Sequence, residues 1–246
     1  MDTVPVALTI AGFDPSGGAG VLADVRTFAA FGVRAVATVT SLTFQNDREF
    51  FGAVHQSGAT VRSQIESTIA RYEIACAKTG MLPTAEVVRE VARLFRNEEL
   101  PAPVVDPVLV SSSGKRLMEE DAVVVLRDEL FPICRVVTPN IPEAETLTGM
   151  QITLEAHMRE AAARIRNLGA RAVLIKGGHL RSDLSIDVLD DDGEITVLRG
   201  ERIEGAVLHG SGCILSAAIA AGLSKGVSLQ DAVSDAKRFV FEELRK

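Results

Sequence analysis

The segment with the clearest chemical potential is His209-Gly210-Ser211-Gly212-Cys213, which leads directly into an apolar stretch of helical character, 214–223. Its two glycines let the backbone turn with the N–H groups facing inward, and the helix that follows adds the positive end of its dipole. This combination is typical of an anion-binding site. The same environment favours a thiolate, so the sequence predicts a lowered pKa for Cys213 and makes it the first candidate for chemistry. The alternative is a helix cap with Cys213 as a small buried filler.

A lysine and two carboxylates follow short apolar runs that are typical of buried strands. Lys176 comes directly after the run 172–175. Its ammonium group must therefore reach an anion, such as a phosphate, or extend to solvent. Asp106 and Glu143 offer the carboxylate oxygens that Mg²⁺ prefers when it also binds nucleotide phosphates. Helix capping is the alternative role for both carboxylates.

Apolar runs and segments of helical periodicity alternate along the chain, and together they must position these side chains. Strands are expected at 4–11, 33–40, 74–78, 104–105, 136–138 and 172–176, and helices at 18–31, 60–72, 84–95, 121–130, 142–147, 154–168, 213–223 and 229–246. A hairpin is expected from 185–189 and 195–198, around an Asp-Gly turn. The pattern predicts an α/β fold, with a doubly wound, mostly parallel sheet and helices on both faces, in a single domain over 1–246.

Ligands of such sheets bind beyond the carboxyl ends of the strands, and the unusual residues of this chain follow the expected strands. In the first of these loops, Gly12 and Gly17 have the spacing of a Walker A motif, but Gly18 and Ala19 stand where that motif requires a lysine and a hydroxyl. A Gly-x-Gly-x-x-Gly motif is also absent. The loop therefore favours either close backbone approach to a small ligand or packing of helix against strand. Asp24, on the helix that follows, faces either the substrate or solvent.

The composition excludes several classes of function. The net charge is -7 and no basic stripe is present, which argues against binding to nucleic acid. No apolar run is long enough to cross a membrane, and the first residues show no signal-peptide pattern. The three cysteines are widely separated, and Cys76 and Cys134 lie in apolar contexts typical of a core. An odd number of distant cysteines favours a reducing cytoplasm over a disulfide scaffold.

Several motifs, taken in order, resemble those of the hydroxymethylpyrimidine and phosphomethylpyrimidine kinases of thiamine biosynthesis, within the ribokinase-like superfamily. They are found at 7–20, 45–46, 78–82, 106–108, 138–144, 176–179 and 209–213. The resemblance covers nearly the whole chain. It implies a three-layer α/β/α fold, the use of ATP and Mg²⁺, and a homodimer. It also implies phosphorylation of the hydroxymethyl group of 4-amino-5-hydroxymethyl-2-methylpyrimidine, and then of its monophosphate.

The resemblance also implies a role for each site residue. Gln45 would read the aminopyrimidine edge together with backbone groups near Gly12 and Val108, and Met81 would line the ring pocket. Cys213 would take the place of the catalytic aspartate of the sugar kinases. The N–H groups of Gly210, Ser211 and Gly212 would lie beside Cys213, and Lys176 would meet the ATP phosphates. Magnesium would be held by Asp106, Asn140 and Glu143.

Two positions depart from the family pattern. Ser211 replaces a threonine and keeps the hydroxyl, whereas Ser112 stands in the loop where the family usually has a lysine. The loss of that charge bears on the second phosphorylation, and the nearby Lys115 is the candidate to replace it. A pyridoxal or pyridoxine kinase is the closest alternative enzyme, and a non-catalytic pyrimidine or nucleotide sensor is the alternative from another class. The sequence leaves open whether a lid closes over the site, and segments 44–51 and 111–116 are the candidates for a flexible lid.

Overall fold

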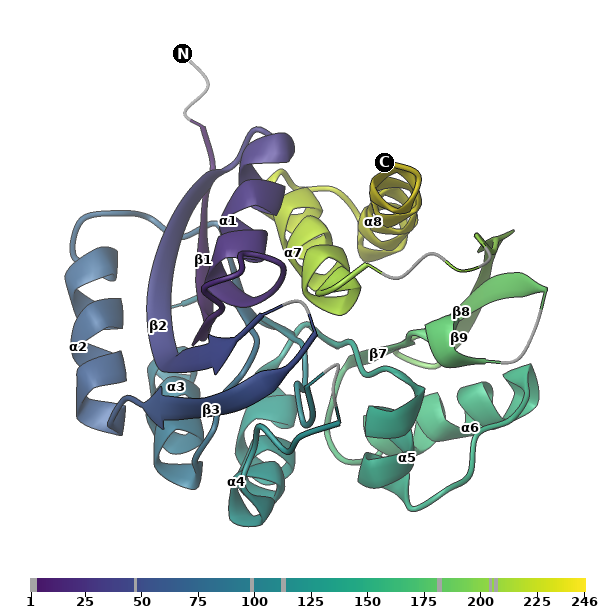
Figure 1. Ribbon diagram of the computed structural model, residues 1–246, viewed down its shortest axis with the longest axis horizontal. Coiled ribbons are helices and arrows are strands. Elements are labelled where there is room, and N and C mark those ends of the chain that lie inside the picture. The colour runs from purple at the N-terminus through teal and green to yellow at the C-terminus, as the bar shows by residue number, and fades with distance from the viewer. Residues whose placement is uncertain are drawn as a thin grey trace.

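A central sheet runs through the computed structural model, which describes residues 4–46, 48–97, 100–111, 114–180, 183–203, 205 and 208–246. Within these residues nine strands pair in the order β3-β2-β1-β4-β5-β6-β7-β8-β9 (Figure 1). The strands are β1 (Val6–Phe13), β2 (Arg34–Gln45), β3 (Phe50–His55), β4 (Cys76–Thr79), β5 (Val104–Val105), β6 (Val136–Val137), β7 (Ala172–Ile175), β8 (Leu184–Asp191) and β9 (Glu194–Glu201). The six from β2 to β7 in the sheet order are parallel, while β3, β8 and β9 are antiparallel additions at the two edges.

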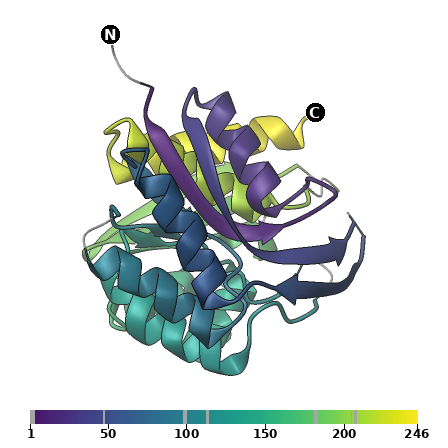
Figure 2. The ribbon, with the colours of Figure 1, turned by 90° about the vertical axis from the view of Figure 1, so that its left-hand side faces the viewer.

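Helices cover both faces of this sheet, so the expected three-layer α/β/α arrangement is confirmed (Figure 2). One face carries α1 (Gly20–Ala30), α7 (Ser211–Ser224) and α8 (Leu229–Leu244). The other carries α2 (Gly58–Ile69), α3 (Ala85–Arg96), α4 (Glu120–Val125), α5 (Ile141–Thr148) and α6 (Glu155–Arg166). A π-helical turn at Leu126–Leu130 and 3-10 turns at Phe131–Ile133 and Gly177–His179 complete the helical segments that the structure describes.

Sequence pattern explains why the elements pack in this way. The central strands β5 and β6 are each a pair of valines without measurable exposure, as expected for parallel strands covered on both faces. Helix α3 begins at the N-cap Thr84, whose side chain accepts the Val87 N–H, and it buries Val87, Val91 and Leu94 at helical spacing. None of the helices in the described part of the chain is both long and apolar enough to cross a membrane.

A strand that the sequence did not predict begins within segment 44–51. Strand β2 continues to Gln45, and β3 returns from Phe50 as an antiparallel edge strand after a short connection. The sequence did not reveal β3 because none of its side chains is buried, so it lacks the alternation of a strand with one buried face. The same hairpin exposes four large apolar side chains, namely Leu42, Phe44, Phe51 and Val54.

The hairpin expected near the end of the chain is confirmed. Strands β8 and β9 pair along their whole length, and the turn residues Asp192 and Gly193 have φ angles of 56° and 96°. Positive φ at both positions defines the type I′ class of turn that suits the twist of a two-residue hairpin. This hairpin extends the sheet beyond β7 and forms one wall of the cavity described below.

Valine-to-alanine substitutions in the neighbouring helices α3 and α4 should differ in their effect on the free energy of unfolding, because one site is buried and the other is exposed. Val91→Ala in α3 removes two methyl groups from a fully buried site and should lower the free energy of unfolding by about 2 kcal/mol. Val124→Ala in α4 changes a side chain that is 48% exposed and should alter stability by less than about 0.5 kcal/mol. Urea unfolding of both variants measures the difference. Equal losses would contradict the packing described here.

Candidate active site

A large cavity of about 1410 Å³ opens at the carboxyl edge of the parallel strands. It brings together residues that are far apart in the chain, as expected for this class of sheet. Of the residues singled out from the sequence, those that line it are Gly12, Gln45, Met81, Asp106, Val108, Asn140, Glu143, Lys176, Gly210, Ser211, Gly212 and Cys213. Asp24 is not among the lining residues.

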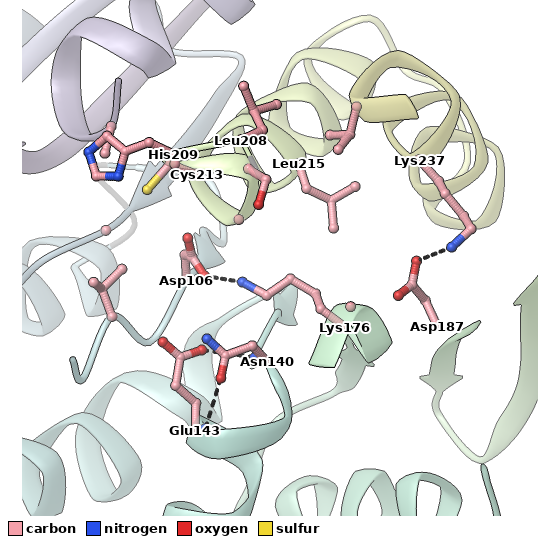
Figure 3. A pocket seen from close by; sticks show the side chains of 18 of the residues that line it. Asp106, Asn140, Glu143, Lys176, Asp187, Leu208, His209, Cys213, Leu215 and Lys237 are labelled. Carbon is pink, nitrogen blue, oxygen red and sulfur yellow. Dashed lines mark hydrogen bonds and ion pairs between the residues drawn. The ribbon is translucent and has the colours of Figure 1, made fainter. Parts of the chain in front are cut away.

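The start of α7 forms the roof of the cavity (Figure 3). Gly210 is its N-cap, with φ 76°, and the helix begins at Ser211. The Ser211 N–H donates to the Leu208 carbonyl at 3.1 Å, so this group is engaged in the turn itself. The first turn of an α-helix leaves N–H groups without intrahelical partners, and here that turn faces the cavity. The expected anion site is therefore formed chiefly by the groups after Ser211 and by the helix dipole.

Cys213 lines the cavity from the first turn of α7. The prediction of a lowered thiol pKa was wrong. Burial raises the pKa of Cys213 to about 11; Lys78 opposes this rise, and the carboxylates of Asp106 and Asp24 add to it. Desolvation disfavours the thiolate more strongly than the cationic surroundings favour it. Cys213 is therefore a protonated thiol near neutral pH, able to donate a hydrogen bond.

Lys176 and Asp106 form a buried ion pair beneath the start of α7, with Nζ and Oδ1 2.7 Å apart (Figure 3). Ser216 also donates to Asp106, from Oγ to Oδ2 at 3.2 Å. Burial alone would lower the pKa of Lys176, but Asp106 and Glu143 raise it above its ordinary value. A Cβ at Gly212 would lie 3.0 Å from the Lys176 Nζ, so the ammonium group reaches the anion site. Lys176 is thus a buried cation in position to meet a phosphate.

Asn140 and Glu143 form a capping box at the start of α5. The Asn140 side chain accepts the Glu143 N–H at 2.9 Å, and the Glu143 carboxylate accepts the Asn140 N–H at 2.8 Å. Glu143 therefore has the capping role that the sequence left open, while it also faces the cavity. Burial raises the pKa of this carboxyl to about 7, against the opposing effect of Lys176.

The donor set of the cavity fits magnesium in one particular way. Among the described residues, no group of three or more His, Cys, Asp or Glu side chains is arranged to hold a metal ion. Mg²⁺ is usually bound by one or two carboxylates together with substrate phosphates and water, so it does not need such a cage. Asp106 and Glu143 supply two carboxylates on the same cavity. The site therefore fits a magnesium ion that arrives with a phosphorylated ligand.

Sequence reasoning gave no role to Lys78, which lines the cavity from β4 without measurable exposure. Its Nζ lies 2.8 Å from both carboxylate oxygens of Asp24, and Thr9 Oγ1 donates to the same carboxylate at 2.5 Å. The structure thus places Asp24 behind the cavity wall as the partner of Lys78. Burial would lower the pKa of Lys78, but Asp24 and Cys213 raise it. The available signal was a lysine within an otherwise apolar strand, because a buried cation requires a partner.

The far half of the cavity was also not predicted. It lies between the β8–β9 hairpin and α8 and has an apolar lining that includes Leu208, Leu215, Val240, Phe241 and Leu244. At its edge Lys237 of α8 faces Asp187 of β8, with 2.6 Å between Nζ and Oδ2 (Figure 3). A flat apolar ring with polar substituents fits this chemistry.

Some of the residues named from the sequence lie outside the described part of the chain or away from the cavity. Ser112, which replaces the family lysine, lies outside the described residues, as do Asp47 and the side chain of His179. Lys115 is exposed and is not among the residues that line the cavity. The expected core positions of Cys76 and Cys134 are confirmed, since both are buried.

Glu143 should give the fold a measurable pH dependence. A carboxyl whose pKa is raised to about 7 stabilises the folded state at low pH, and this contribution disappears as the pH rises through that value. Glu143→Gln should therefore be more stable relative to the wild type at about pH 8 than at about pH 5. Thermal unfolding without added metal tests this, with the exposed Glu160→Gln as the control. An identical offset at both pH values would contradict the assignment.

Comparison with known proteins identifies the family of the chain. The family model described as phosphomethylpyrimidine kinase matches residues 14–246. A hydroxymethylpyrimidine/phosphomethylpyrimidine kinase of Streptomyces coelicolor is 42% identical over 97% of this chain and 88% of the relative. A thiamine biosynthesis bifunctional protein ThiED of Geobacter sulfurreducens is 41% identical over 97% of this chain, which spans 49% of that protein. The structure of an ADP complex of Bacillus subtilis pyridoxal kinase superposes with a TM-score of 0.88, at 35% identity, over 96% of this chain and 90% of that one. The chain therefore belongs to the phosphomethylpyrimidine kinase family.

Proposed function

We propose that this protein transfers the γ-phosphoryl group of ATP to the hydroxymethyl group of 4-amino-5-hydroxymethyl-2-methylpyrimidine, and then phosphorylates the monophosphate, in thiamine biosynthesis. One observation supports the proposal above the others. A single cavity is lined both by Gln45 and Met81 and by the start of α7, with the buried Lys176 between the strands and that helix. Family membership and the similarity to thiamine biosynthesis proteins support the choice of substrate.

The alcohol half of the cavity suits a small aromatic ring. Gln45 lies at the end of β2, and its amide group can both donate to and accept from an aminopyrimidine edge. Gly12 and Met81 pack closely, since a Cβ at Gly12 would lie 3.1 Å from the Met81 sulfur. A side chain at position 12 would therefore narrow the ring pocket. Backbone groups of Gly12 and Val108 complete the proposed contacts with the ring.

Phosphoryl transfer depends mainly on the positions of the reacting groups and on stabilisation of charge. Lys176 and the start of α7 would hold the transferring phosphoryl group and balance its charge. Since the Cys213 thiol is protonated near neutral pH, we assign it the positioning role: it would hold the alcohol oxygen by a hydrogen bond. The apolar half between β8–β9 and α8 would hold the adenine ring, with Lys237 and Asp187 at its edge.

Magnesium fits the same arrangement. Asp106 and Glu143, with the Asn140 side chain nearby, would hold the ion. Bound there with ATP, it would offset the negative charge of the phosphates. We further propose that residues 1–246 work as one domain in a reducing cytoplasm, since the three cysteines of the chain are free thiols.

A second candidate is a pyridoxal kinase, favoured by the close superposition on the Bacillus subtilis enzyme of that name. Both substrates are aromatic nitrogen rings that carry a hydroxymethyl group. The two proposals share the anion site and the nucleotide half of the cavity, and they differ in what Gln45 and Met81 contact. Turnover on both alcohols is therefore the measurement that separates them.

A coupled assay for ADP, with and without magnesium, tests the function on hydroxymethylpyrimidine, its monophosphate and pyridoxine. We expect turnover to depend on magnesium and to be fastest with hydroxymethylpyrimidine. Cys213→Ala should lower kcat at least ~10-fold with little change in pyrimidine affinity, because it removes a positioning contact. Gln45→Leu should instead raise the KM for the pyrimidine at least ~10-fold, because it removes polar contacts with the ring.

Other outcomes of this assay would change the assignment. Preferred turnover of pyridoxine would favour the second candidate, and binding of the pyrimidine without ADP release from any alcohol would indicate a sensor. Unchanged turnover of Cys213→Ala would remove that residue from the mechanism. An unaltered KM of Gln45→Leu would refute its role in reading the ring.

We also propose a homodimer in which a second copy covers the outer surface of the β2–β3 hairpin. Phe44 and Phe51 are 53% and 65% exposed there, beside Leu42 and Val54. An exposed apolar surface of this kind marks an interaction site, and the free edge of β3 adds unpaired backbone groups. The resemblance to dimeric kinases supports a second copy as the partner.

The dimer predicts a large difference between two substitutions of exposed side chains. Phe51→Lys should convert the protein to a monomer in sedimentation velocity, because it places a charge in the apolar surface. Val124→Lys, on α4 and 48% exposed, should leave the wild-type species unchanged. A wild-type protein that sediments as a monomer at micromolar concentration would contradict the proposal.

A further inference from the structure

Two loops far apart in the sequence are fastened together above the cavity. Asp14 follows β1 and is almost fully buried, and its carboxylate accepts the N–H groups of Ser16 and Ala19, both at 2.9 Å. The same carboxylate lies 3.0 Å from His209 Nε2, at the start of the α7 turn. Asp14 therefore folds its own loop and at the same time holds the loop that precedes Cys213.

Backbone packing reinforces this contact. A Cβ at Gly210 would lie 2.1 Å from the Gly18 carbonyl oxygen, and a Cβ at Gly18 would lie 2.2 Å from the His209 ring. Position 210 requires glycine, because the backbone of the other loop is too close for a side chain and φ is positive, whereas a side chain at position 18 would displace the His209 ring. A side-chain contact and close backbone packing thus join the same two loops.

We propose that the Asp14–His209 pair is a positioning clamp for phosphoryl transfer. This inference rests on the proposed kinase function and gives a role to Asp14 and His209, which the proposed function does not use. The Asp14 loop borders the alcohol pocket through Ala19 and Gly20, whereas the His209 loop supplies the phosphate-binding turn and Cys213. The pair fixes the distance between the two reacting groups.

The clamp would affect how precisely the reacting groups are placed more than how tightly the substrates bind. Displacement of a reacting group by about 1 Å lowers turnover by roughly 100-fold, even when both substrates still bind. The start of α7 contacts the Asp14 loop through glycines, which supply no side chains to hold it in place. The imidazole of His209 supplies that missing side-chain contact, and the buried Asp14 gives it a fixed partner.

The chain offers a matched control pair outside the cavity. Asp190 is buried, accepts the Gly193 N–H at 2.8 Å to hold a turn, and pairs with Arg166 at 3.2 Å. Asp190 therefore makes the same two kinds of contact as Asp14: it accepts a backbone N–H within a turn and it pairs with a side chain from another element. Arg166→Ala removes the partner of this carboxylate in the way that His209→Ala removes the partner of Asp14.

The test combines steady-state kinetics with amide hydrogen exchange on the full chain. For His209→Ala we expect kcat to fall ~10- to 100-fold, while the KM values for alcohol and ATP change less than ~3-fold. The hydrogen-bonded amides of Ser211 and Ile214 should exchange at least ~10-fold faster than in the wild type. His209→Gln, whose amide nitrogen can replace Nε2, should recover most of kcat. Arg166→Ala should retain wild-type kinetics and wild-type exchange at these two amides.

The outcomes separate the clamp from a merely structural role and from the function itself. Unchanged exchange of the Ser211 and Ile214 amides in His209→Ala, or an equal loss of kcat in Arg166→Ala, would overturn the clamp. A raised KM with kcat intact would also overturn it, because His209 would then act as a direct ligand. If the wild type phosphorylates none of the alcohols, the proposed function fails, and the exchange data still decide whether the clamp holds the loop.

Discussion

The arrangement of this site depends on one constraint, which is that a charge removed from water must meet an opposite charge. Two lysines lie at the carboxyl edge of the central strands, and each is buried against a carboxylate: Lys78 against Asp24, and Lys176 against Asp106. Together these pairs tie α1, β4, β7 and the loop after β5 to one point beneath α7. The two ion pairs therefore fix the positions of four charges at the base of the cavity, and these charges set the electrostatic potential at the groups above them.

Cys213 shows how these charges affect the protonation of a neighbouring group. The start of a helix and two nearby ammonium groups favour a thiolate, yet burial and the carboxylate partners of the lysines keep the sulfur protonated. Each lysine brings its own counter-charge, so the net positive potential at the sulfur is small. A thiol that donates a hydrogen bond is compatible with phosphoryl transfer, because this chemistry needs position and charge balance more than a strong base.

The sequence predicted the elements whose patterns are local. The apolar strands and amphipathic helices followed from periodicity, the first turn of α5 from Pro142, and the β8–β9 turn from Asp192 and Gly193. It could not reveal β3, because an exposed edge strand is held by pairing with β2 more than by burial. Partners distant in sequence, such as Lys78 with Asp24 or Asp14 with His209, were equally invisible, since nothing in either local segment specifies the other. The sign of the Cys213 pKa shift failed for the same reason: it depends on burial, which is a property of the whole fold.

The pairing of Lys176 with Asp106 connects the resting protein to its proposed reaction. In the structure, Asp106 is the anion that balances Lys176, and both lie beside the helix start where a phosphate would bind. In the proposed function, Lys176 would pair with the phosphate, and Asp106 would be one of the residues that hold the magnesium ion, which would supply positive charge beside the phosphate. Each buried side chain would then still face an opposite charge, so neither would be left unpaired. The ion pair thus satisfies both buried charges in the free protein and keeps them at the helix start where a phosphate would bind.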